Sequence, residues 1–396
     1  MPLDLTFAPV RKLVYSLIAF QLLAYSCQLK ENKFSDKPSY TIPKPSYLSK
    51  SDSIKWNEKI SHFFDSTLLK HKGFFNGSIL IAKGGNILYE SYVGYSNFEK
   101  KEDTLTENTP IHIASASKTF TAMAILQLIE KDKLKLTDTI TKFFPTLPYP
   151  GVTIKMLLSH RSGIPNYVHF LDQSGWDQSK YIENKDVLDI LINQHPPASY
   201  PPDSHFEYSN TNYLLLALVI EKITGMDYPN YMQQYVFNPL GMKNSFVYTT
   251  ADSARATKSY SERGISWGRD YMDHTYGDKN IYSTPRDLLN WDRVLYTNQF
   301  LSKAMLELAY SPSSFEKKSF HNYGLGWRLL MLPNGKKIIY HFGRWHGNNA
   351  AFARIPDQDA TIIILGNRFS LYIYNVAHAC YNLFETASSN SEKEED

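Results

Sequence analysis

Ser115 and Lys118 form an S-x-x-K pattern at the point where a strongly apolar segment begins. Residues three apart lie on one face of a helix, so the lysine amine can reach the serine hydroxyl one turn away. A serine hydroxyl becomes a good nucleophile when a neighbouring base takes its proton. A lysine can be that base once burial has lowered its pKa enough to leave it uncharged. The pair therefore indicates nucleophilic catalysis through a covalent acyl intermediate.

The same pattern occurs a second time, at Ser314 to Lys317, within a polar stretch that no apolar helix follows. The setting therefore selects Ser115 as the candidate nucleophile. An N-cap serine followed by a surface lysine would give the same letters, and this is the alternative interpretation of Ser115.

Two further short motifs follow in the chain. Y-S-N at Tyr208–Asn210 stands directly before the apolar helical segment T-N-Y-L-L-L-A-L-V-I, and H-F-G at His341–Gly343 closes the strand-like run K-K-I-I-Y-H. A glycine at that point lets a substrate come close to the backbone. Each motif recurs elsewhere in the chain and means little alone. The order S-x-x-K, Y-x-N, H-x-G, each in a suitable structural setting, is far more specific.

Other catalytic patterns are weak or missing from the sequence. G-I-S-W-G at Gly264–Gly268 matches the G-x-S-x-G nucleophile elbow, which needs an apolar strand before it and a helix after it. The flanking segments S-Y-S-E-R and R-D-Y-M-D-H fit neither element, so Ser266 is not expected to be catalytic. The sequence contains no H-E-x-x-H run, Walker-type loop or complete dinucleotide fingerprint, so neither a metal nor a cofactor is expected.

Composition limits the class of protein. The chain has 396 residues, of which 43% are hydrophobic and 20% charged, enough for a large core. This excludes a mainly disordered protein, and two cysteines exclude a disulfide-stapled scaffold. The 42 basic and 39 acidic residues give a net charge of +3 without a basic stripe, which excludes a dedicated nucleic-acid binder.

The N-terminal segment is typical of an export signal. Arg11 and Lys12 precede a short apolar run, Leu13–Tyr25, which is too short for a comfortable membrane span. The following L-A-Y-S-C, ending at Cys27, resembles a bacterial lipobox. We therefore expect removal of residues 1–26 and lipidation of Cys27, giving an exported bacterial membrane lipoprotein that faces the periplasm or the cell surface. A plain signal peptide with an incidental cysteine is the alternative.

The elements that must position the motifs can be read along the mature chain. Residues 27–50 are polar and proline-spaced, typical of a tether, and residues 386–396 form an acidic tail. Between them, 51–385, we expect a helix near 53–69, a hairpin around Gly84-Gly85, a buried helix over 118–129, mostly helical segments over about 130–315, three strands, and a helix over 371–384. This order predicts an α+β fold: an antiparallel sheet built from both chain ends and flanked by helices, with a mostly helical inserted domain.

Long segments around the motifs resemble the class C β-lactamase-like serine hydrolases, which include D-alanyl-D-alanine carboxypeptidases, D-aminopeptidases and esterases. The resemblance runs from about Gly77 to Asn367 and includes I-A-S-A-S-K-T-F-T-A, T-I-K-M-L-L-S-H-R-S-G-I-P-N-Y, N-P-L-G-M, I-Y-S-T-P-R-D-L and Y-G-L-G-W. It implies the serine β-lactamase/penicillin-binding-protein fold and a cofactor-free serine hydrolase that acts on small-molecule or peptide substrates.

The resemblance also implies roles for individual residues. Ser115 corresponds to the acyl-forming nucleophile and Lys118 to its partner, Tyr208 to the general base or proton shuttle, and Asn210 to a residue that orients substrate. The backbone N–H groups of Ser115 and Arg344 correspond to the oxyanion hole, where losing one donor costs about 10²–10³ in rate. His160 and Ser162, in the second long segment, are expected to shape a loop rather than to catalyse.

The third motif departs from the family pattern, because relatives carry K-T-G or H-T-G where this chain has His341, Phe342 and Gly343. Phe342 has no hydroxyl for a substrate carboxylate, and an unperturbed histidine is mostly neutral near pH 7. We therefore expect an apolar ring beside the oxyanion strand and a preference for esters or neutral substrates over β-lactams. The Arg344 side chain either replaces the carboxylate anchor or faces solvent.

Other functions stay open at this point. One is a β-lactamase, D-alanyl-D-alanine carboxypeptidase or D-aminopeptidase. Another, of a different class, is a catalytically inactive ligand-binding or sensor domain with the same fold. The presence of Ser115, Lys118, Tyr208 and Asn210 favours a working hydrolase over the inactive domain.

Overall fold

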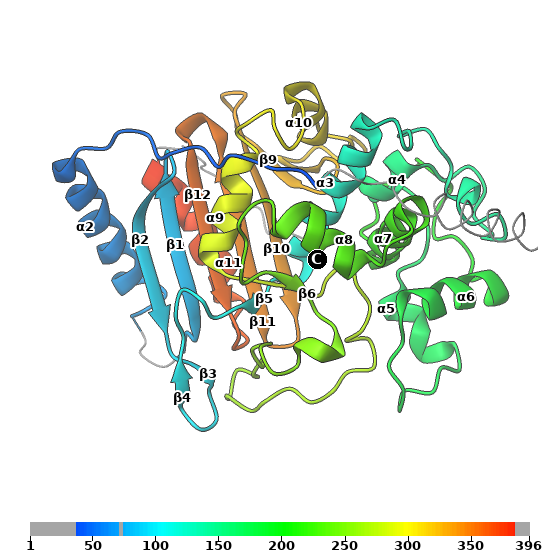
Figure 1. Cartoon of the computed structure of the whole chain (residues 1–396), viewed down its shortest axis with the longest axis horizontal. Helices are drawn as coiled ribbons and strands as arrows, with labels where there is room; N and C mark the ends of the chain where they lie inside the picture. The colour runs from blue at the N-terminus through cyan, green and yellow to red at the C-terminus, as the bar shows by residue number, and fades with distance from the viewer. Residues whose placement is uncertain (1–36, 71–73, 385–396) are drawn as a thin grey trace, which may run out of the picture. The chain divides into compact units, whose positions relative to one another are not determined.

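The main sheet is assembled from the two ends of the chain. The computed structural model describes residues 37–70 and 74–384, so Cys27, the signal segment and the acidic tail lie outside the described residues. Seven antiparallel strands follow the order β2-β1-β12-β11-β10-β9-β8 (Figure 1). Their bounds are β1 Gly77–Lys83, β2 Asn86–Val93, β8 His321–Tyr323, β9 Arg328–Met331, β10 Lys337–Trp345, β11 Asn348–Ile355 and β12 Ala360–Gly366.

Strand β1 joins the two halves of the sheet. It pairs on one edge with β2, through a turn whose Gly84 and Gly85 have φ of 56° and 78°, and on the other with β12. Two consecutive residues with positive φ favour glycine and match the right-handed twist of a hairpin. In the β1–β12 register, Gly77 lies opposite Gly366. The expected α+β fold with an antiparallel sheet from both chain ends is thereby confirmed.

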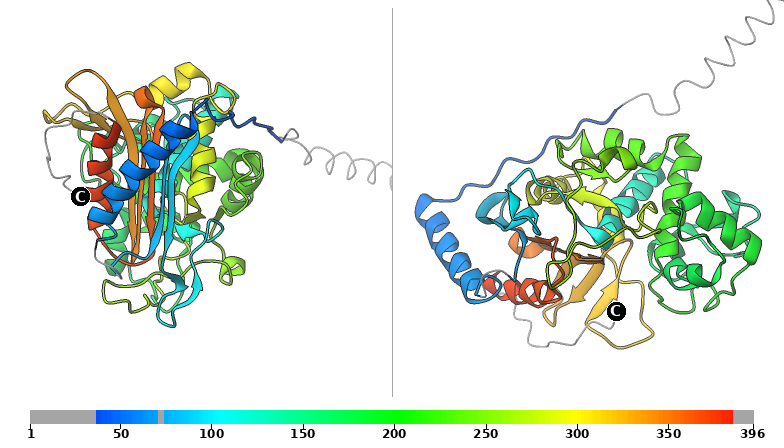
Figure 2. Two further views of the ribbon diagram at one scale, coloured as in Figure 1. Left: turned by 90° about the vertical axis from the view of Figure 1, so that its left-hand side faces the viewer. Right: turned by 90° about the horizontal axis from the view of Figure 1, so that it is seen from below.

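Helices cover both faces of the sheet. On one face lie α2 (Lys50–Ser66) and α11 (Tyr372–Cys380), whose apolar residues join one core with alternate residues of the central strands. Figure 2 shows these two helices side by side, with α9 (Pro285–Val294) on the opposite face of the sheet. On the α9 face, a buried ion pair joins Asp292 of α9 to Arg354 of β11.

The middle of the chain forms the helical part beside the sheet. It contains α4 (Ile154–Leu158), α5 (Tyr167–Phe170), α6 (Asn184–Gln194), α7 (Asn210–Thr224), α8 (Tyr228–Met232) and α10 (Lys303–Ala309). The chain also forms a small sheet of order β5-β7-β6 (Ile111–His112, Ile281–Ser283, Phe246–Val247). A ribbon of β3 (Tyr95–Asn97) and β4 (Glu102–Thr104) lies beyond the end of β2 (Figure 1). No helix within the described residues is long and apolar enough to cross a membrane.

Helix α3 (Ser117–Glu130) lies between the sheet and the helical part and is buried over nearly its whole length, because its residues are apolar all round. The segment before α2 contacts the same unit. The Gln127 amide on α3 donates to the Tyr40 hydroxyl at 2.6 Å, and the Tyr40 ring lies 5.3 Å from that of Phe300. The second half of the expected tether therefore contributes packing contacts, and the described residues from Ser39 onward belong to one compact unit.

Candidate active site

Ser115 lies in a short 3-10 turn, η1 (Ala114–Ala116), directly before α3. Ala114 has a φ of 48°, a left-handed conformation that costs a non-glycine residue free energy. The Ala114 N–H donates to Nδ1 of His112 at 3.2 Å, which helps to hold the turn. The strained turn leaves Ser115 partly exposed between the buried residues Ala114 and Ala116.

Lys118 is fully buried and its Nζ atom faces three oxygen atoms. They are Oγ of Ser115 at 3.2 Å, Oδ1 of Asn210 at 2.7 Å and the main-chain oxygen of Asp278 at 2.8 Å. Burial lowers the pKa of Lys118 from 10.5 to about 7; the charge of Asp278 opposes this shift and that of Arg328 adds to it. An uncharged amine has two N–H groups and one lone pair. With Asn210 and Asp278 accepting the two N–H groups, the lone pair is available to the Ser115 hydroxyl.

Tyr208 stands at the end of the loop that leads into α7. Its ring centroid lies 4.9 Å from Lys118 Nζ and 4.4 Å from the ring of the buried His160. Asn210 is the first residue of α7, and its N–H donates to Oδ1 of Asn166 at 3.1 Å. The Y-x-N motif thus supplies an aromatic hydroxyl and an amide on the side of Lys118 that faces the helical part.

His341 lies on β10 and is fully buried. Its Nδ1 donates to the main-chain oxygen of Phe342 at 2.7 Å, so the neutral ring uses Nε2 to accept from the Tyr323 hydroxyl at 3.1 Å. Burial, together with the charges of Arg328 and Lys118, holds the pKa of His341 well below its usual value. The third motif therefore presents an uncharged imidazole.

Gly343 brings β10 against the nucleophile turn. A Cβ atom on this glycine would lie 2.4 Å from the Ile113 main-chain oxygen and 2.7 Å from the Ser115 nitrogen, so a side chain would collide with backbone. Because Gly343 has no side chain, β10 can lie directly against the backbone of the Ser115 turn, and a substrate can also come close to β10. This packing places β10 beside the Ser115 N–H, as an oxyanion hole built from Ser115 and Arg344 requires.

The structure does not bring Phe342 into the site. Side chains alternate across a strand, so Phe342 leaves β10 on the face opposite His341. Its ring is 8% exposed and packs in the core against Tyr374 and His378 of α11. The expected apolar wall beside the oxyanion strand is therefore absent at Phe342. Arg344 is exposed and follows the same alternation, which directs its side chain away from the His341 face.

Arg328 contributes to the site and was missed by the motif analysis. Its guanidinium carbon lies 5.4 Å from the Tyr208 ring centroid, and its charge lowers the pKa of Lys118, His341 and His160. Arg328 directly follows the segment Y-G-L-G-W, which marks its neighbourhood in the sequence. His160 and Ser162 have the loop-shaping contacts that the sequence predicted. The Ser209 N–H donates to Nδ1 of His160 at 3.2 Å, and the Ser162 hydroxyl donates to Asn212 at 2.6 Å.

The rejected G-x-S-x-G segment lies away from these residues, in an exposed loop. The Ser266 N–H donates to Glu99 at 2.9 Å, and the segment connects no strand to a helix. Ser314 of the second S-x-x-K lies in another loop, where its hydroxyl is 3.4 Å from Arg161. These surroundings differ from those of Ser115, whose hydroxyl lies 3.2 Å from the buried Lys118 amine.

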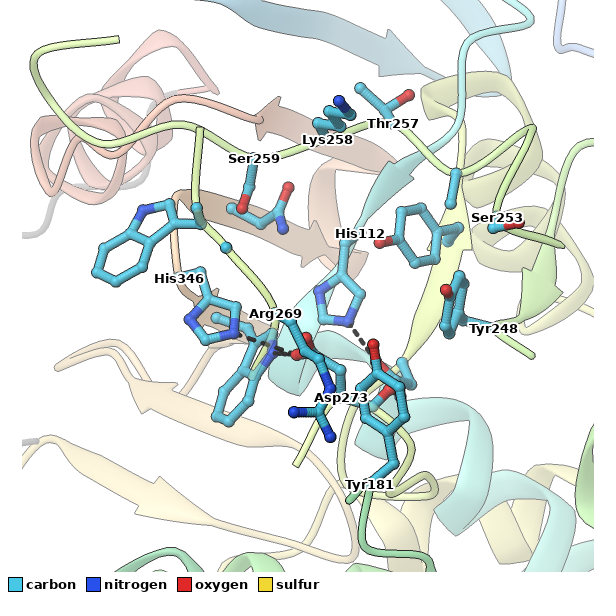
Figure 3. A pocket seen from close by; sticks show the side chains of 17 residues that line it. His112, Tyr181, Tyr248, Ser253, Thr257, Lys258, Ser259, Arg269, Asp273 and His346 are labelled. Carbon is cyan, nitrogen blue, oxygen red and sulfur yellow. Dashed lines mark hydrogen bonds and ion pairs between the residues drawn. The ribbon is translucent and has the colours of Figure 1, made fainter. Parts of the chain in front are cut away.

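A pocket of about 230 Å³ lies beyond the end of β10 (Figure 3). Its lining includes His112, Asp273 and His346, and the Asp273 carboxylate accepts from His346 Nε2 at 3.1 Å and from the Trp345 indole at 2.9 Å. Sequence patterns gave no signal for this pocket, because its residues come from five separate segments. Within residues 37–70 and 74–384, no group of three His, Cys, Asp or Glu side chains is arranged to hold a metal ion.

Comparisons with known proteins agree with this geometry. Residues 64–373 match the family described as Beta-lactamase. The chain is 35% identical over 333 residues to Penicillin-binding protein 4* of Bacillus subtilis (strain 168), covering 80% of this chain and 73% of that protein. It is 28% identical over 328 residues to Protein flp of Staphylococcus aureus (strain MW2), covering 78% of this chain but only 63% of that protein.

A solved structure extends the likeness to three dimensions. The penicillin-binding protein from Bacillus halodurans superposes with a TM-score of 0.72 at 26% identity, covering 82% of this chain and 98% of that one. Residues 64–373, which match the family, include the serine turn, the Y-x-N segment and all seven strands of the main sheet. The chain therefore belongs to the Beta-lactamase family of serine hydrolases.

Proposed function

We propose that this protein is an exported, lipid-anchored serine hydrolase that forms an acyl-enzyme at Ser115 and acts on carboxylic esters in preference to amides and peptides. The observation that carries the proposal is the contact of 3.2 Å between Lys118 Nζ and Ser115 Oγ, made by a lysine that is fully buried and has a pKa of about 7. A base with a pKa near the working pH is efficient in proton transfer.

Acylation uses the groups around Ser115 in a fixed order. Ser115 Oγ attacks the carbonyl carbon while its proton passes to the Lys118 lone pair, and the carbonyl oxygen becomes an oxyanion. The N–H groups of Ser115 and Arg344 donate to that oxyanion. When the tetrahedral intermediate collapses, the bond to the leaving group breaks and the leaving oxygen or nitrogen takes a proton from Lys118, directly or through the Tyr208 hydroxyl.

Deacylation repeats these steps with water. Tyr208 or Lys118 takes a proton from a water molecule, whose oxygen attacks the acyl carbon, and Ser115 Oγ leaves and regains a proton. Asn210 holds the Lys118 amine in position, because its Oδ1 accepts a hydrogen bond from Lys118 Nζ at 2.7 Å. Its amide NH₂ group remains available to orient the substrate. The reaction consumes one water and yields a carboxylic acid and an alcohol.

Two features of the site support the preference for esters. His341 is uncharged, and both of its ring nitrogens have partners within the protein, so the third motif supplies no cation for a substrate carboxylate. The Phe206 ring, 36% exposed, packs near Tyr323 and His160, which both adjoin Tyr208. It supports an apolar acyl or leaving group on the Tyr208 side of the nucleophile.

A second candidate function is acylation by penicillin or by a peptide ending in D-alanine. The name of the Bacillus subtilis relative and its 35% identity favour it, and Arg328 adds a guanidinium group near Tyr208. Guanidinium groups match the geometry of a carboxylate. On this alternative Arg328, rather than His341 or Arg344, would anchor the substrate carboxylate.

Export and membrane anchoring rest on the sequence alone. The basic pair Arg11 and Lys12, the apolar run that follows and Cys27 within L-A-Y-S-C support cleavage before Cys27 and its lipidation. A membrane-anchored hydrolase would meet its substrate outside the cytoplasm. Oxidation is no hazard to the mature thiol there, because Cys380 is fully buried.

A substrate panel tests the proposal. Wild-type protein and Ser115→Ala are assayed with p-nitrophenyl butyrate, nitrocefin and D-amino-acid p-nitroanilides, and intact mass is recorded after exposure to a fluorophosphonate and to penicillin G. We expect ester turnover by the wild type alone and a fluorophosphonate adduct on Ser115. Faster turnover of nitrocefin than of the ester would favour the second candidate. Absence of any adduct would identify an inactive ligand-binding domain.

A further inference from the structure

A buried ion pair lies directly behind the catalytic lysine. Asp278 and Lys279 stand in the loop before β7, with exposures of 0% and 3%, and their side-chain charges are 3.6 Å apart. The loop is pinned to the helices, because the Thr121 hydroxyl on α3 donates to the Gly277 main-chain oxygen at 2.7 Å. A Cβ on Gly277 would also lie 2.5 Å from the main-chain oxygen of Tyr213 on α7. The pair is therefore held in a fixed position against Lys118.

Asp278 faces Lys118 through its backbone and Lys279 through its side chain. Its main-chain oxygen accepts from Lys118 Nζ at 2.8 Å, while Oδ2 accepts from the Tyr167 hydroxyl at 2.8 Å. Oδ1 is buried and has no hydrogen-bond partner among the described residues. Lys279 is thus the cation that balances the poorly solvated carboxylate of Asp278, the residue whose main-chain oxygen Lys118 contacts.

Besides Asp278, Lys279 contacts groups that carry no charge of their own. Its Nζ donates to the Tyr167 hydroxyl at 2.5 Å and to Thr275, and lies 4.6 Å from the Trp345 ring centroid. Burial lowers the pKa of Lys279 from its usual value, and the charge of Lys118 adds to this shift. The charges of Asp278, Asp273 and Asp270 oppose it and favour the charged form of Lys279.

The charges around Lys118 show why this pair matters. The charges of Asp278 and Arg328 shift the pKa of Lys118 in opposite directions, and Lys118 and Lys279 repel each other when both are charged. The other titratable groups near it, His160, His341 and the phenols of Tyr208 and Tyr213, are neutral in their ordinary states or are held neutral by burial. An unbalanced carboxylate beside Lys118 would favour its charged form, which has no lone pair for the Ser115 proton.

We infer that Lys279 is a positioning residue for acylation, because its ammonium group balances the Asp278 carboxylate and thereby lets Lys118 stay uncharged and accept the Ser115 proton. This inference rests on the proposed function, since it assigns Lys118 the role of base. It predicts that the two members of the buried pair affect the base in opposite directions. A purely structural ion pair would lower stability whichever member is removed, without moving the pH dependence of Ser115 reactivity.

The test measures the rate of Ser115 labelling by a fluorophosphonate as a function of pH, using the full chain. In this reaction Ser115 Oγ bonds to phosphorus, fluoride leaves and the serine proton passes to Lys118, so no assumption about the natural substrate is needed. We expect the wild-type rate to rise through a midpoint near pH 7, as Lys118 loses its proton. Circular dichroism of each variant shows that it is folded.

Four variants separate charge from structure. Lys279→Met should move the midpoint upward by about one pH unit or more and slow labelling at pH 7 by at least about fivefold. Lys279→Arg should stay within about twofold of wild type, since it keeps the charge. Asp278→Asn should move the midpoint downward, because Lys279 is then unbalanced. The double variant Asp278→Asn/Lys279→Met, which lacks both charges, should return close to the wild-type midpoint.

A matched control lies elsewhere in the core. Arg354 and Asp292 form another buried ion pair, with a contact of 2.5 Å and exposures of 2% and 0%. Arg354→Met should lower stability but leave the midpoint unchanged. An unmoved midpoint in folded Lys279→Met, or no return in the double variant, overturns the inference. Should Lys279→Met not fold, an unmoved midpoint in Asp278→Asn overturns it. Wild-type protein that is never labelled at Ser115 refutes the proposed function instead.

Discussion

The rings of Phe342 and Tyr374 stack with centroids 5.2 Å apart and planes 15° apart, which joins β10 to α11 across the core. The Tyr374 hydroxyl also donates to the Gly343 main-chain oxygen at 2.7 Å. Phe342, the middle residue of the H-F-G motif, thus stabilises β10 from the core side of the sheet, opposite the face that carries His341. It does not form the surface that a substrate meets.

This packing predicts the effect of restoring the family's threonine. Phe342→Thr should lower the free energy of unfolding by about 3 kcal/mol, because it leaves a cavity and buries a hydroxyl. Nitrocefin turnover should not increase. Urea unfolding and steady-state assays check both expectations, with Phe342→Leu as a milder control. A tenfold gain in nitrocefin turnover with an unchanged unfolding midpoint would show that the side chain faces the substrate after all.

The two candidate serines should behave differently. Ser115→Ala should remove fluorophosphonate labelling and reduce ester turnover by at least about 10³-fold, since it deletes the nucleophile. Ser266→Ala should leave kcat/KM within about twofold of wild type, because Ser266 lies in an exposed loop and its structural contact with Glu99 is made by its backbone N–H. The opposite pattern would reassign the active site to the G-x-S-x-G segment.

The burial of Lys118 should be measurable as a pH-dependent loss of stability. Its pKa is about 7 in the folded protein, against 10.5 for an ordinary lysine, so the unfolded chain binds more protons between these values. Wild-type stability, compared with Lys118→Met, should therefore fall as the pH is lowered from about 10 to 7 and level off below. The full change is on the order of 4 kcal/mol.

Denaturant titrations of wild type and Lys118→Met at several pH values check this expectation. Hydrogen bonds lost in the variant shift the difference by a nearly constant amount and do not create its pH dependence. A difference that stays constant between pH 7 and 10 would mean that Lys118 is charged in the folded protein and cannot serve as the base.

Lipidation should decide where the protein is found. Full-length protein made in a bacterium that processes lipoproteins should enter the detergent phase of a Triton X-114 partition, with a mass that matches cleavage before Cys27 and acylation. Cys27→Ser should lose the acyl mass and leave the detergent phase. Cys380→Ala, which alters the buried cysteine, serves as the matched control. Equal partitioning of the Cys27→Ser variant would rule out a lipid anchor at this residue.

Much of the architecture could be predicted from local sequence. The run apolar on all sides predicted a buried helix over 118–129, and α3 spans Ser117–Glu130. The last helix was expected over 371–384, where α11 covers Tyr372–Cys380 and a 3-10 turn continues to Phe384. The sequence motifs also named four side chains that the fold brings together from two distant segments: Ser115, Lys118, Tyr208 and Asn210.

The side to which Phe342 points could not be predicted, for a physical reason. Strand β10 is buried on both faces over most of its length, so it shows no alternation of polar and apolar residues that would mark the site face. The Asp278–Lys279 pair was missed for a different reason. G-D-K-N before β7 reads as an exposed turn, and only tertiary packing against α3 and α7 buries its charges.

The pairing of β1 with β12 determines the stage of synthesis and folding at which the active site becomes complete. The Ser115 turn is made early in synthesis, but β10 and β12, which complete the oxyanion hole and the sheet, are among the last segments added. Contacts between residues so far apart in sequence form late and slowly in folding. A growing chain thus carries a serine without an oxyanion hole, and its hydrolytic activity begins only once β10 and β12 have been made and have joined the sheet.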